Sequence, residues 1–236
     1  MVNIGTTDFY INVPSLPRGE FESYSSLLFD DWENYVHDVL ELQDYSLSLN
    51  VEEGSIKAKA KIAATTLGIL YIGIGQYGSF ISGLGTIESQ VISASEYLGQ
   101  RAGKPFSSRN IRPNIRRRGE SLSRLKGIFE KIKRGQISVE EAMIESEILF
   151  GPEMKNVPGL IDDLENAFAQ APLMPQQIHL PLVSADGEEL MPDEEKNTKK
   201  NKPTKPKEPI PAPDHYRIEV WRESKKSKRN LRVVDL

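Results

Sequence analysis

The sequence predicts an α+β protein in which antiparallel β-hairpins are combined with amphipathic helices. Three observations lead to this fold class. Residues 45–62 alternate apolar and polar side chains on either side of a turn, which is the pattern of a half-buried β-hairpin. Apolar residues at 25–42, 80–98 and 121–150 recur at steps of three and four, which is the period of an amphipathic helix. Residues 215–236 regain strand character after a stretch rich in Pro and Lys.

The composition limits the classes of protein to be considered. The chain has 236 residues, of which 38% are hydrophobic and 27% charged, enough for one domain of ordinary size and a linker. It has no cysteine, which excludes disulfides, thiolate metal sites and cysteine nucleophiles. The N-terminus lacks the basic region and apolar core of a secretory signal, so we expect a cytoplasmic or cytoplasm-facing protein.

The first elements are predicted from short apolar patterns. Apolar residues alternate in "DFYINV", residues 8–13, which predicts a strand that ends before Pro14. Residues 25–42 carry one apolar stripe at helical spacing, made up of Leu28, Trp32, Tyr35, Val39 and Leu42. The hairpin at 45–62 follows, and the wet face of its second strand carries Lys57, Lys59 and Lys61.

A long uncharged run, from Ile62 to Ile87, follows the hairpin and is rich in glycine. Heptad-like apolar spacing continues to Leu98, so we expect one glycine-rich hydrophobic helix over residues 62–98. Within it, "GIGQYG" at 73–78 matches the phosphate-binding pattern G-x-G-x-x-G. An antiparallel hairpin precedes this motif and no βαβ unit follows it, so we expect no nucleotide cofactor.

The same run is long enough to enter a membrane. As a helix it would span about 39 Å, against a hydrocarbon core of about 30 Å. Small residues spaced by four form a ridge of the kind at which membrane helices approach each other. The residues predicted to serve membrane insertion and self-association are Gly73, Gly75, Gly78, Ser82, Gly83 and Thr86. The alternative is a helix of a soluble protein that other elements cover on all sides.

A strongly basic stretch occupies residues 101–134, where only Glu120 and Glu130 oppose the positive charge. Such an excess indicates an anionic partner, either the headgroups of an anionic membrane surface or the phosphates of a nucleic acid. The residues predicted to bind this partner are Arg109, Arg112, Arg116, Arg117, Arg118, Arg124, Lys126, Lys131, Lys133 and Arg134.

The second half of the basic stretch begins a helical hairpin, predicted over 121–150. Gly135 is placed to end its first helix, and Ser138 with Glu141 forms a capping box for the second. A further short helix is predicted at 159–170.

The chain is expected to have three parts. Residues 1–171 form the α+β core, residues 172–214 a largely disordered linker, and residues 215–236 a C-terminal β-hairpin. Because a lone hairpin is marginally stable in water, we expect this last part to dock on another element of the protein.

The helical hairpin carries a resemblance to a known family. "LSRLKGIFEKIKRGQISVEEA", residues 122–142, resembles the short bacterial helical-hairpin modules of the SHOCT type. In these a leucine-bearing helix meets a glycine, then Ile-Ser or Ile-Thr, and then a capping acidic pair. The resemblance covers this segment alone, and it implies a role in oligomerisation or tethering.

No convergent set of nucleophile, base and metal ligands is recognisable, so we expect neither catalysis nor a bound metal. The histidines are isolated from one another, at positions 37, 179 and 215. "PDHYRIEVWRESK" matches the carboxylate-then-E-x-K pattern of metal-dependent nucleases through Asp214, Glu223 and Lys225, with Glu219 as another ligand. The E-x-K falls in a basic turn, so a charged hairpin loop is the preferred interpretation and a nuclease the alternative.

Together these features favour a non-enzymatic, self-associating protein that engages the inner face of the membrane from the cytoplasm. Residues 62–87 would enter the membrane and residues 101–134 would bind anionic headgroups. A bacterial toxin or defence effector would fit this description. The alternative is a soluble adaptor or scaffold that binds nucleic acid or a protein partner through the basic region 101–134.

Overall fold

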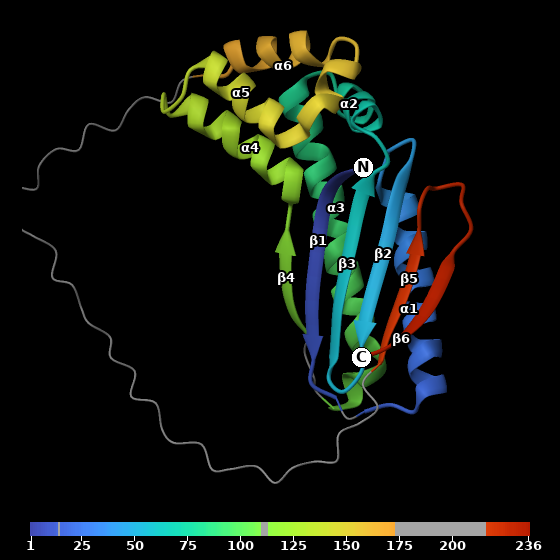
Figure 1. Ribbon diagram of the computed structural model, residues 1–236. Coiled ribbons are helices and arrows are strands. Elements are labelled where there is room, and N and C mark those ends of the chain that lie inside the picture. Colours follow the sequence, from blue (N-terminus) through green and yellow to red (C-terminus); the bar gives the residue numbers. More distant parts are fainter. Residues whose placement is uncertain (14, 110–112, 173–215) are drawn as a thin grey trace, which may run out of the picture.

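The computed structural model describes residues 1–13, 15–109, 113–172 and 216–236. Six antiparallel strands form one sheet, and helices pack against one of its faces and beyond one of its ends (Figure 1). This confirms the predicted α+β class. The linker expected at 172–214 lies outside the described residues, apart from Pro172.

The order of the strands in the sheet is β4-β1-β3-β2-β5-β6, and every neighbouring pair is antiparallel. The strands are β1 (Val2–Ile11), β2 (Tyr45–Glu52), β3 (Ile56–Ala64), β4 (Asn114–Arg118), β5 (Tyr216–Arg222) and β6 (Asn230–Asp235). The hairpin predicted at 45–62 forms β2 and β3 in the centre. The C-terminal hairpin docks as expected, because β5 pairs with β2.

Two long helices, α1 (Arg18–Val39) and α3 (Phe80–Gly103), lie behind the sheet in Figure 1 and cover one of its faces. The shorter helices gather near the end of the sheet at which β1 begins. They are α2 (Leu67–Gly75), α4 (Glu120–Lys133), α5 (Val139–Phe150) and α6 (Leu160–Ala169). Two 3-10 helices, η1 (Lys104–Arg109) and η2 (Gly151–Asn156), follow α3 and α5.

The core lies between the sheet and the two long helices. Alternate residues of β3 (Ala58, Ala60 and Ile62) are buried on the helix side, and the lysines between them are exposed on the other. Trp32 of α1 and Leu98 of α3 are fully buried against this face. The two long helices therefore cover the apolar face of the hairpin, and the face that carries the lysines stays open.

The single helix expected over 62–98 is wrong in its bounds, because the uncharged run contains a strand end and two helices. β3 continues to Ala64, and the side chain of Thr66 caps the start of α2. After α2 the chain turns at Gly78, which has φ of +80°, and Ser79 caps the start of α3. The two helices meet at 109°.

Two glycines of this run allow close packing within the protein. A Cβ on Gly83, in α3, would collide with the backbone carbonyl of Ile74 in α2, and a Cβ on Gly73 would collide with the side chain of Leu42. By contrast, a Cβ on Gly85 would meet nothing within 4 Å. The glycines that look alike in the sequence therefore have different roles in the structure.

The helical hairpin predicted at 121–150 corresponds to α4 and α5. Ser138 accepts a hydrogen bond from the backbone N–H of Glu141, whose side chain accepts one from the backbone N–H of Ser138, so the capping box is present. Phe129 of α4 packs against Phe168 of α6, with ring centroids 4.5 Å apart. The three helices thus share one part of the core.

Replacing glycine by alanine at positions 83 and 85 should have opposite effects on stability. We expect Gly83→Ala to lower the free energy of unfolding by about 1–3 kcal/mol, because the added methyl group overpacks the contact between α2 and α3. Gly85→Ala should raise it by about 0.5–1 kcal/mol, because alanine is the better helix former at an exposed position. Urea denaturation of both variants measures this difference, and equal effects would contradict the assigned packing.

Candidate functional site: an open basic face of the sheet

The face of the sheet that neither long helix covers is the candidate functional site (Figure 1). The strand register places every second residue of all six strands on this open face, in rows that run across the sheet. The first row consists of Asn114, Tyr10, Lys57, Glu52, Arg217 and Val234. The second consists of Arg116, Asp8, Lys59, Asn50, Glu219 and Arg232. The third consists of Arg118, Thr6, Lys61, Ser48, Trp221 and Asn230.

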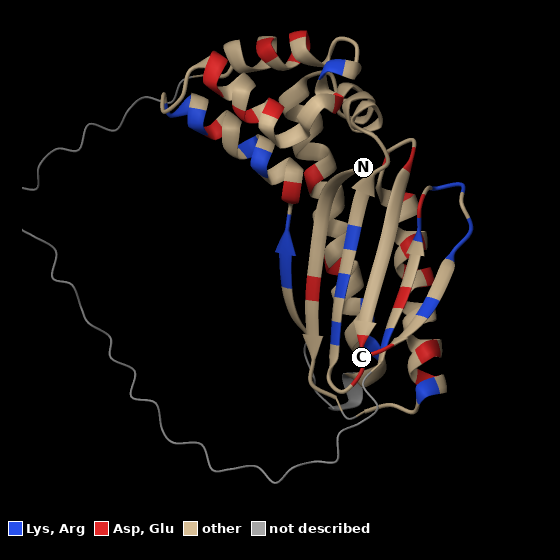
Figure 2. Cartoon of the chain, in the orientation of Figure 1, with Lys and Arg blue, Asp and Glu red and all other residues tan. Residues whose placement is uncertain are grey.

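Basic residues outnumber acidic residues on this face. In Figure 2 blue bands follow β3 and β4, and a red band marks β1 between them. We name this surface the basic sheet face. Its cations are Lys57, Lys59, Lys61, Arg116, Arg118, Arg217 and Arg232. Its acidic residues are Asp8, Glu52 and Glu219.

Three arginines of the basic sheet face are held by these carboxylates. Arg118 lies 2.5 Å from Asp8, measured between nitrogen and oxygen. Arg217 pairs with Glu219 at 2.8 Å and reaches Glu52 at 4.0 Å. Arg232 pairs with Glu219 at 2.6 Å, and its hydrogen bonds hold the pKa of that carboxyl below its usual range.

The remaining four cations have no ion pair within the described part of the chain. They are Lys57, Lys59, Lys61 and Arg116, and all four are exposed. Three of them follow one another at alternate positions of β3, so their Cα atoms are about 7 Å apart along the strand. Asp8 faces Lys59 and Glu52 faces Lys57 across the sheet, but these two carboxylates form their ion pairs with Arg118 and Arg217. Seven cations against three carboxylates leave a surplus of positive charge on this face.

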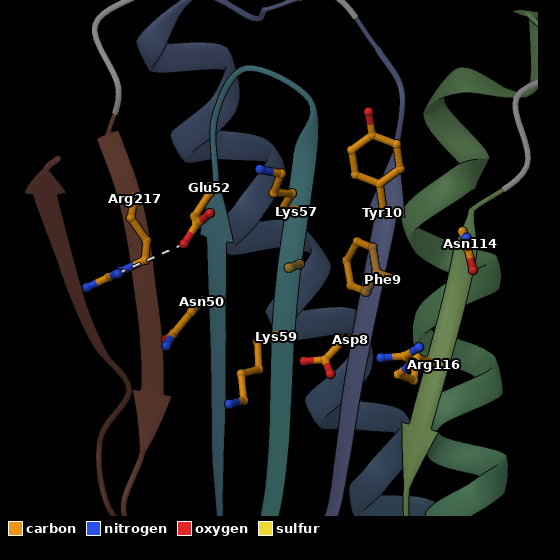
Figure 3. A pocket seen from close by; sticks show the side chains of 11 residues that line it. Asp8, Phe9, Tyr10, Asn50, Glu52, Lys57, Lys59, Asn114, Arg116 and Arg217 are labelled. Carbon is orange, nitrogen blue, oxygen red and sulfur yellow. Dashed lines mark ion pairs between the residues drawn. The ribbon is translucent and has the colours of Figure 1, made fainter. Parts of the chain in front are cut away.

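A depression of about 560 Å³ lies over the first and second rows of this face (Figure 3). Tyr10, Lys57, Lys59, Arg116 and Arg217 are among the residues that line it. In Figure 3 Asp8 lies between Lys59 and Arg116, and Glu52 is joined to Arg217. The depression therefore has a positive lining with a few interspersed carboxylates.

Two aromatic rings share this face with the cations. Tyr10, in β1, is 40% exposed, and Trp221, in β5, is half-buried in the third row. An exposed ring on a positively charged sheet offers a surface on which a planar group can stack.

The residues of the basic stretch 101–134 are distributed over different surfaces. Arg116 and Arg118 lie on the open face, whereas Arg117 points to the helix side and pairs with Glu96 of α3 at 2.8 Å. Three lysines pair with carboxylates near the helical hairpin: Lys126 with Glu88, Lys131 with Glu145, and Lys133 with Glu130. Arg124 and Arg134 are exposed and have no ion pair among the described residues. Arg112 lies outside those residues, and of Arg109 only the backbone, at the end of η1, is described.

The residues predicted to form a membrane or self-association ridge do not form one continuous row. Gly73 and Gly83 are buried in contacts within the protein, and Gly75 ends α2. Gly78 lies in the turn, so it is not on the helix that carries Ser82 and Thr86. The hydroxyl of Thr86 donates a hydrogen bond to the backbone carbonyl of Ser82, 2.9 Å away.

The residues of the nuclease-like pattern each have a different environment in the structure. Asp214 is outside the described residues, and Glu219 is occupied by two arginines. Glu223 follows β5 at the turn, and the backbone N–H of Lys225 donates to Asp44 at 2.7 Å. Within the described ranges, no group of three or more His, Cys, Asp or Glu side chains is arranged to hold a metal ion.

Comparisons with known protein families, with curated proteins and with solved structures find no match to this chain. The functional interpretation therefore rests on the geometry of the open face. The sequence indicated the wet face of β3 and, separately, Arg116 and Arg118 as cations for an anionic partner, but not that these residues share one surface. Their position beside the lysines depends on the pairing of β4 with β1, and that of Arg217 on the pairing of β5 with β2.

The pair formed by Arg232 and Glu219 should contribute to stability in a pH-dependent way. The pKa of Glu219 is lowered in the folded protein. The pair therefore stabilises the fold above the pKa of an unfolded glutamate, about 4.3, and this contribution disappears as the pH falls through the lower folded value. We expect Arg232→Gln to lower the free energy of unfolding at neutral pH by at most about 1 kcal/mol, because the pair is near the surface.

Urea denaturation at neutral pH and at about pH 3 tests this linkage. The difference between Arg232→Gln and the wild type should shrink on acidification. Lys226→Gln is the control, because Lys226 has no carboxylate partner among the described residues. A difference for Arg232→Gln that stayed constant with pH would contradict the assigned ion pair.

Proposed function

We propose that the protein binds single-stranded nucleic acid on the basic sheet face. The observation that carries this proposal is the column of Lys57, Lys59 and Lys61 on the central strand, exposed and without ion pairs in the described part of the chain. A nucleic acid backbone carries one negative charge per nucleotide, and lysine and arginine bind it by displacing condensed counterions. A surface with regularly spaced cations that form no ion pairs suits such a polymer.

The shape of the face favours a single strand over a duplex. Sequence readers of duplex DNA insert a helix or a two-stranded ribbon into a groove. Here the cations lie on a broad sheet with a shallow depression, and the rings of Tyr10 and Trp221 are on the same surface. Exposed sheets that combine basic residues with aromatic rings bind unpaired bases by stacking and hold the backbone by charge.

The alternative predicted from the sequence was an adaptor that binds nucleic acid through the basic region 101–134. This proposal has the same kind of partner but a different binding surface. Of the residues predicted from the basic stretch, Arg116 and Arg118 lie on the basic sheet face. Lys126 and Lys131 are neutralised by Glu88 and Glu145. A cation that is already paired must lose its partner before it can bind a phosphate, so it adds less to binding than a free one.

The triple variant Lys57→Gln, Lys59→Gln and Lys61→Gln should bind single-stranded oligonucleotides much more weakly. Loss of three phosphate contacts should reduce the affinity by about 100-fold near 0.1 M salt and lower the slope of log K against log salt concentration by about 2. Fluorescence anisotropy with a labelled oligothymidine and a labelled oligouridine measures both quantities. These side chains are exposed, so the fold should be retained.

A matched control removes the same charge from the helical hairpin. Arg124→Gln, Lys131→Gln and Arg134→Gln change three exposed cations of α4 and its C-cap. We expect this variant to bind nearly as well as the wild type. If it lost more affinity than the β3 variant, binding would belong to the helical hairpin, and if the wild type did not bind, the proposal would be rejected.

One observation favours a second candidate function, engagement of the membrane. Within the described residues no single helix has the length and apolar composition to cross a membrane, whereas the bent pair of α2 and α3 passes that test as a broken span or re-entrant loop. Buried core helices of soluble proteins pass the same test. Leu70, Ile74 and Ile87 are buried in the core here, so insertion would require them to leave it.

Membrane fractionation distinguishes the two functions. Ile72, in α2, and Ile81, at the start of α3, have large apolar side chains that are 47% and 37% exposed. If the protein binds nucleic acid from solution, both the wild type and Ile72→Asp with Ile81→Asp should stay in the soluble fraction. Wild-type protein that resisted a carbonate wash, together with release of the variant, would favour the membrane function instead.

A further inference from the structure

The two edges of the sheet differ in their protection against pairing with another strand. β4, at one edge, contains three consecutive arginines, Arg116 to Arg118, and Pro113 precedes it. Charged side chains and proline are the means by which natural sheets block edge-to-edge association. This edge is therefore protected.

β6, at the other edge, has less of this protection: its charged residues are Arg232 and Asp235, and they are not consecutive. Its sequence, Asn230–Asp235, contains no proline, and it pairs with β5 without a register shift. Its outer side pairs with no strand in the described part of the chain. Leu231 is 42% exposed, and Val233 and Val234 are only partly buried. A straight edge strand with free backbone groups and exposed apolar side chains is a template for a further strand.

An ion pair connects α1 to the residue before β6, and an exposed apolar side chain lies one turn earlier in the same helix. Arg229, immediately before β6, forms an ion pair with Asp30 of α1. Leu27 lies three residues before Asp30, so it occupies the same side of the helix, and it is 63% exposed. Leu231 and Val233 are on the helix side of β6, since Val233 pairs with the buried Ile218. Leu231 and Val233 therefore provide apolar surface at the free backbone edge itself.

We propose that two copies of this protein associate through β6. A two-fold axis perpendicular to the sheet would pair the two β6 strands in antiparallel orientation, so that two six-stranded sheets become one continuous sheet. Main-chain hydrogen bonds hold the strands, and Leu27 with Leu231 of each copy covers the junction on the helix side. This inference does not depend on the nucleic acid proposal.

Charge and side-chain direction select the register of this pairing. In a continuous antiparallel sheet, residues that face each other point to the same side of the sheet. Successive residues of one strand point to opposite sides, so a residue cannot face the next residue of the second copy. One residue of β6 must therefore face its own counterpart across the two-fold axis. Centred on Val233, the pairing sets Arg232 against Val234 of the second copy and Leu231 against its Asp235, so no like charges meet. Centred on Arg232, it would set two arginines against each other, which is destabilising. The second copy is therefore a self-complementary occupant of this edge.

Single introduced cysteines test the interface and its register, because the chain has no cysteine of its own. Residues directly opposite on antiparallel strands have Cβ atoms about 4.5–5.5 Å apart, close to the range that a disulfide spans. We expect Val233→Cys to form a disulfide-linked dimer on mild oxidation, seen on a non-reducing gel. Leu231→Cys is the matched control: it is more exposed, but its two copies would be about 13 Å apart and should not cross-link.

Sedimentation without nucleic acid gives the second measurement. The wild type should reach twice the chain mass of 26.5 kDa as its concentration rises. Leu27→Glu with Leu231→Glu should remain monomeric, whereas Ile144→Glu with Ile148→Glu, at exposed sites on α5, should leave the dimer intact. Circular dichroism melting checks that each variant is folded.

The outcomes separate the proposal from its rivals. A wild type that stays monomeric at every concentration overturns it. A dimer abolished by the α5 variant and not by the Leu27 and Leu231 variant assigns self-association to the helical hairpin and overturns it as well. Cross-linking of Leu231→Cys in preference to Val233→Cys overturns the register. Because these measurements contain no nucleic acid, their result is independent of the test of the basic sheet face.

Discussion

The alternation of side chains in β3 from Ile56 to Ile62 is the constraint on which the rest of the structure depends. Ala58, Ala60 and Ile62 are buried toward the two long helices, and the lysines between them are exposed on the other side. A slip of one residue would turn the lysines into the core, where an unpaired charge is very costly, and would expose the apolar residues. Because β1 and β2 both pair with β3, its register also fixes theirs. The composition of the core and of the open face is thus decided by the same strand.

Patterns within one element could be predicted from the sequence, whereas features that arise between elements could not. The hairpin of β2 and β3, the apolar stripe of α3 and the capping box at Ser138 each depend on neighbouring residues, and all are present. β4 was missed because "NIRRR" has no apolar alternation and becomes a strand by pairing with β1. The helix expected over 62–98 failed because its internal caps, Thr66 and Ser79, are uncharged residues within an uncharged run.

The number of basic residues in a stretch of the sequence does not indicate how much positive charge collects on one surface of the folded protein. The basic stretch contributes to the open face, to the helix side of β4 and to the helical hairpin, and in the last of these Glu88 and Glu145 pair with two of its lysines. The basic sheet face instead collects cations from four strands, β3 to β6, which come from three separate parts of the sequence. Its central column, which one strand supplies, could be predicted as the wet face of a hairpin, and Arg116 and Arg118 could be predicted as cations for an anionic partner. The identity of its neighbours required knowledge of the strand order.

The position of β5 next to β2 has a consequence for the order in which the protein folds. Leu49 and Val220 face each other in the sheet although they are about 170 residues apart in the chain. During synthesis the strands β4, β1, β3 and β2 can assemble while β5 is still unmade, and such distant pairings are the slow ones. Until then β2 is an outer strand with free backbone groups, open to wrong pairing within the cell. The C-terminal hairpin covers that edge of β2, and the free edge of the sheet then moves from a central strand to the shorter β6.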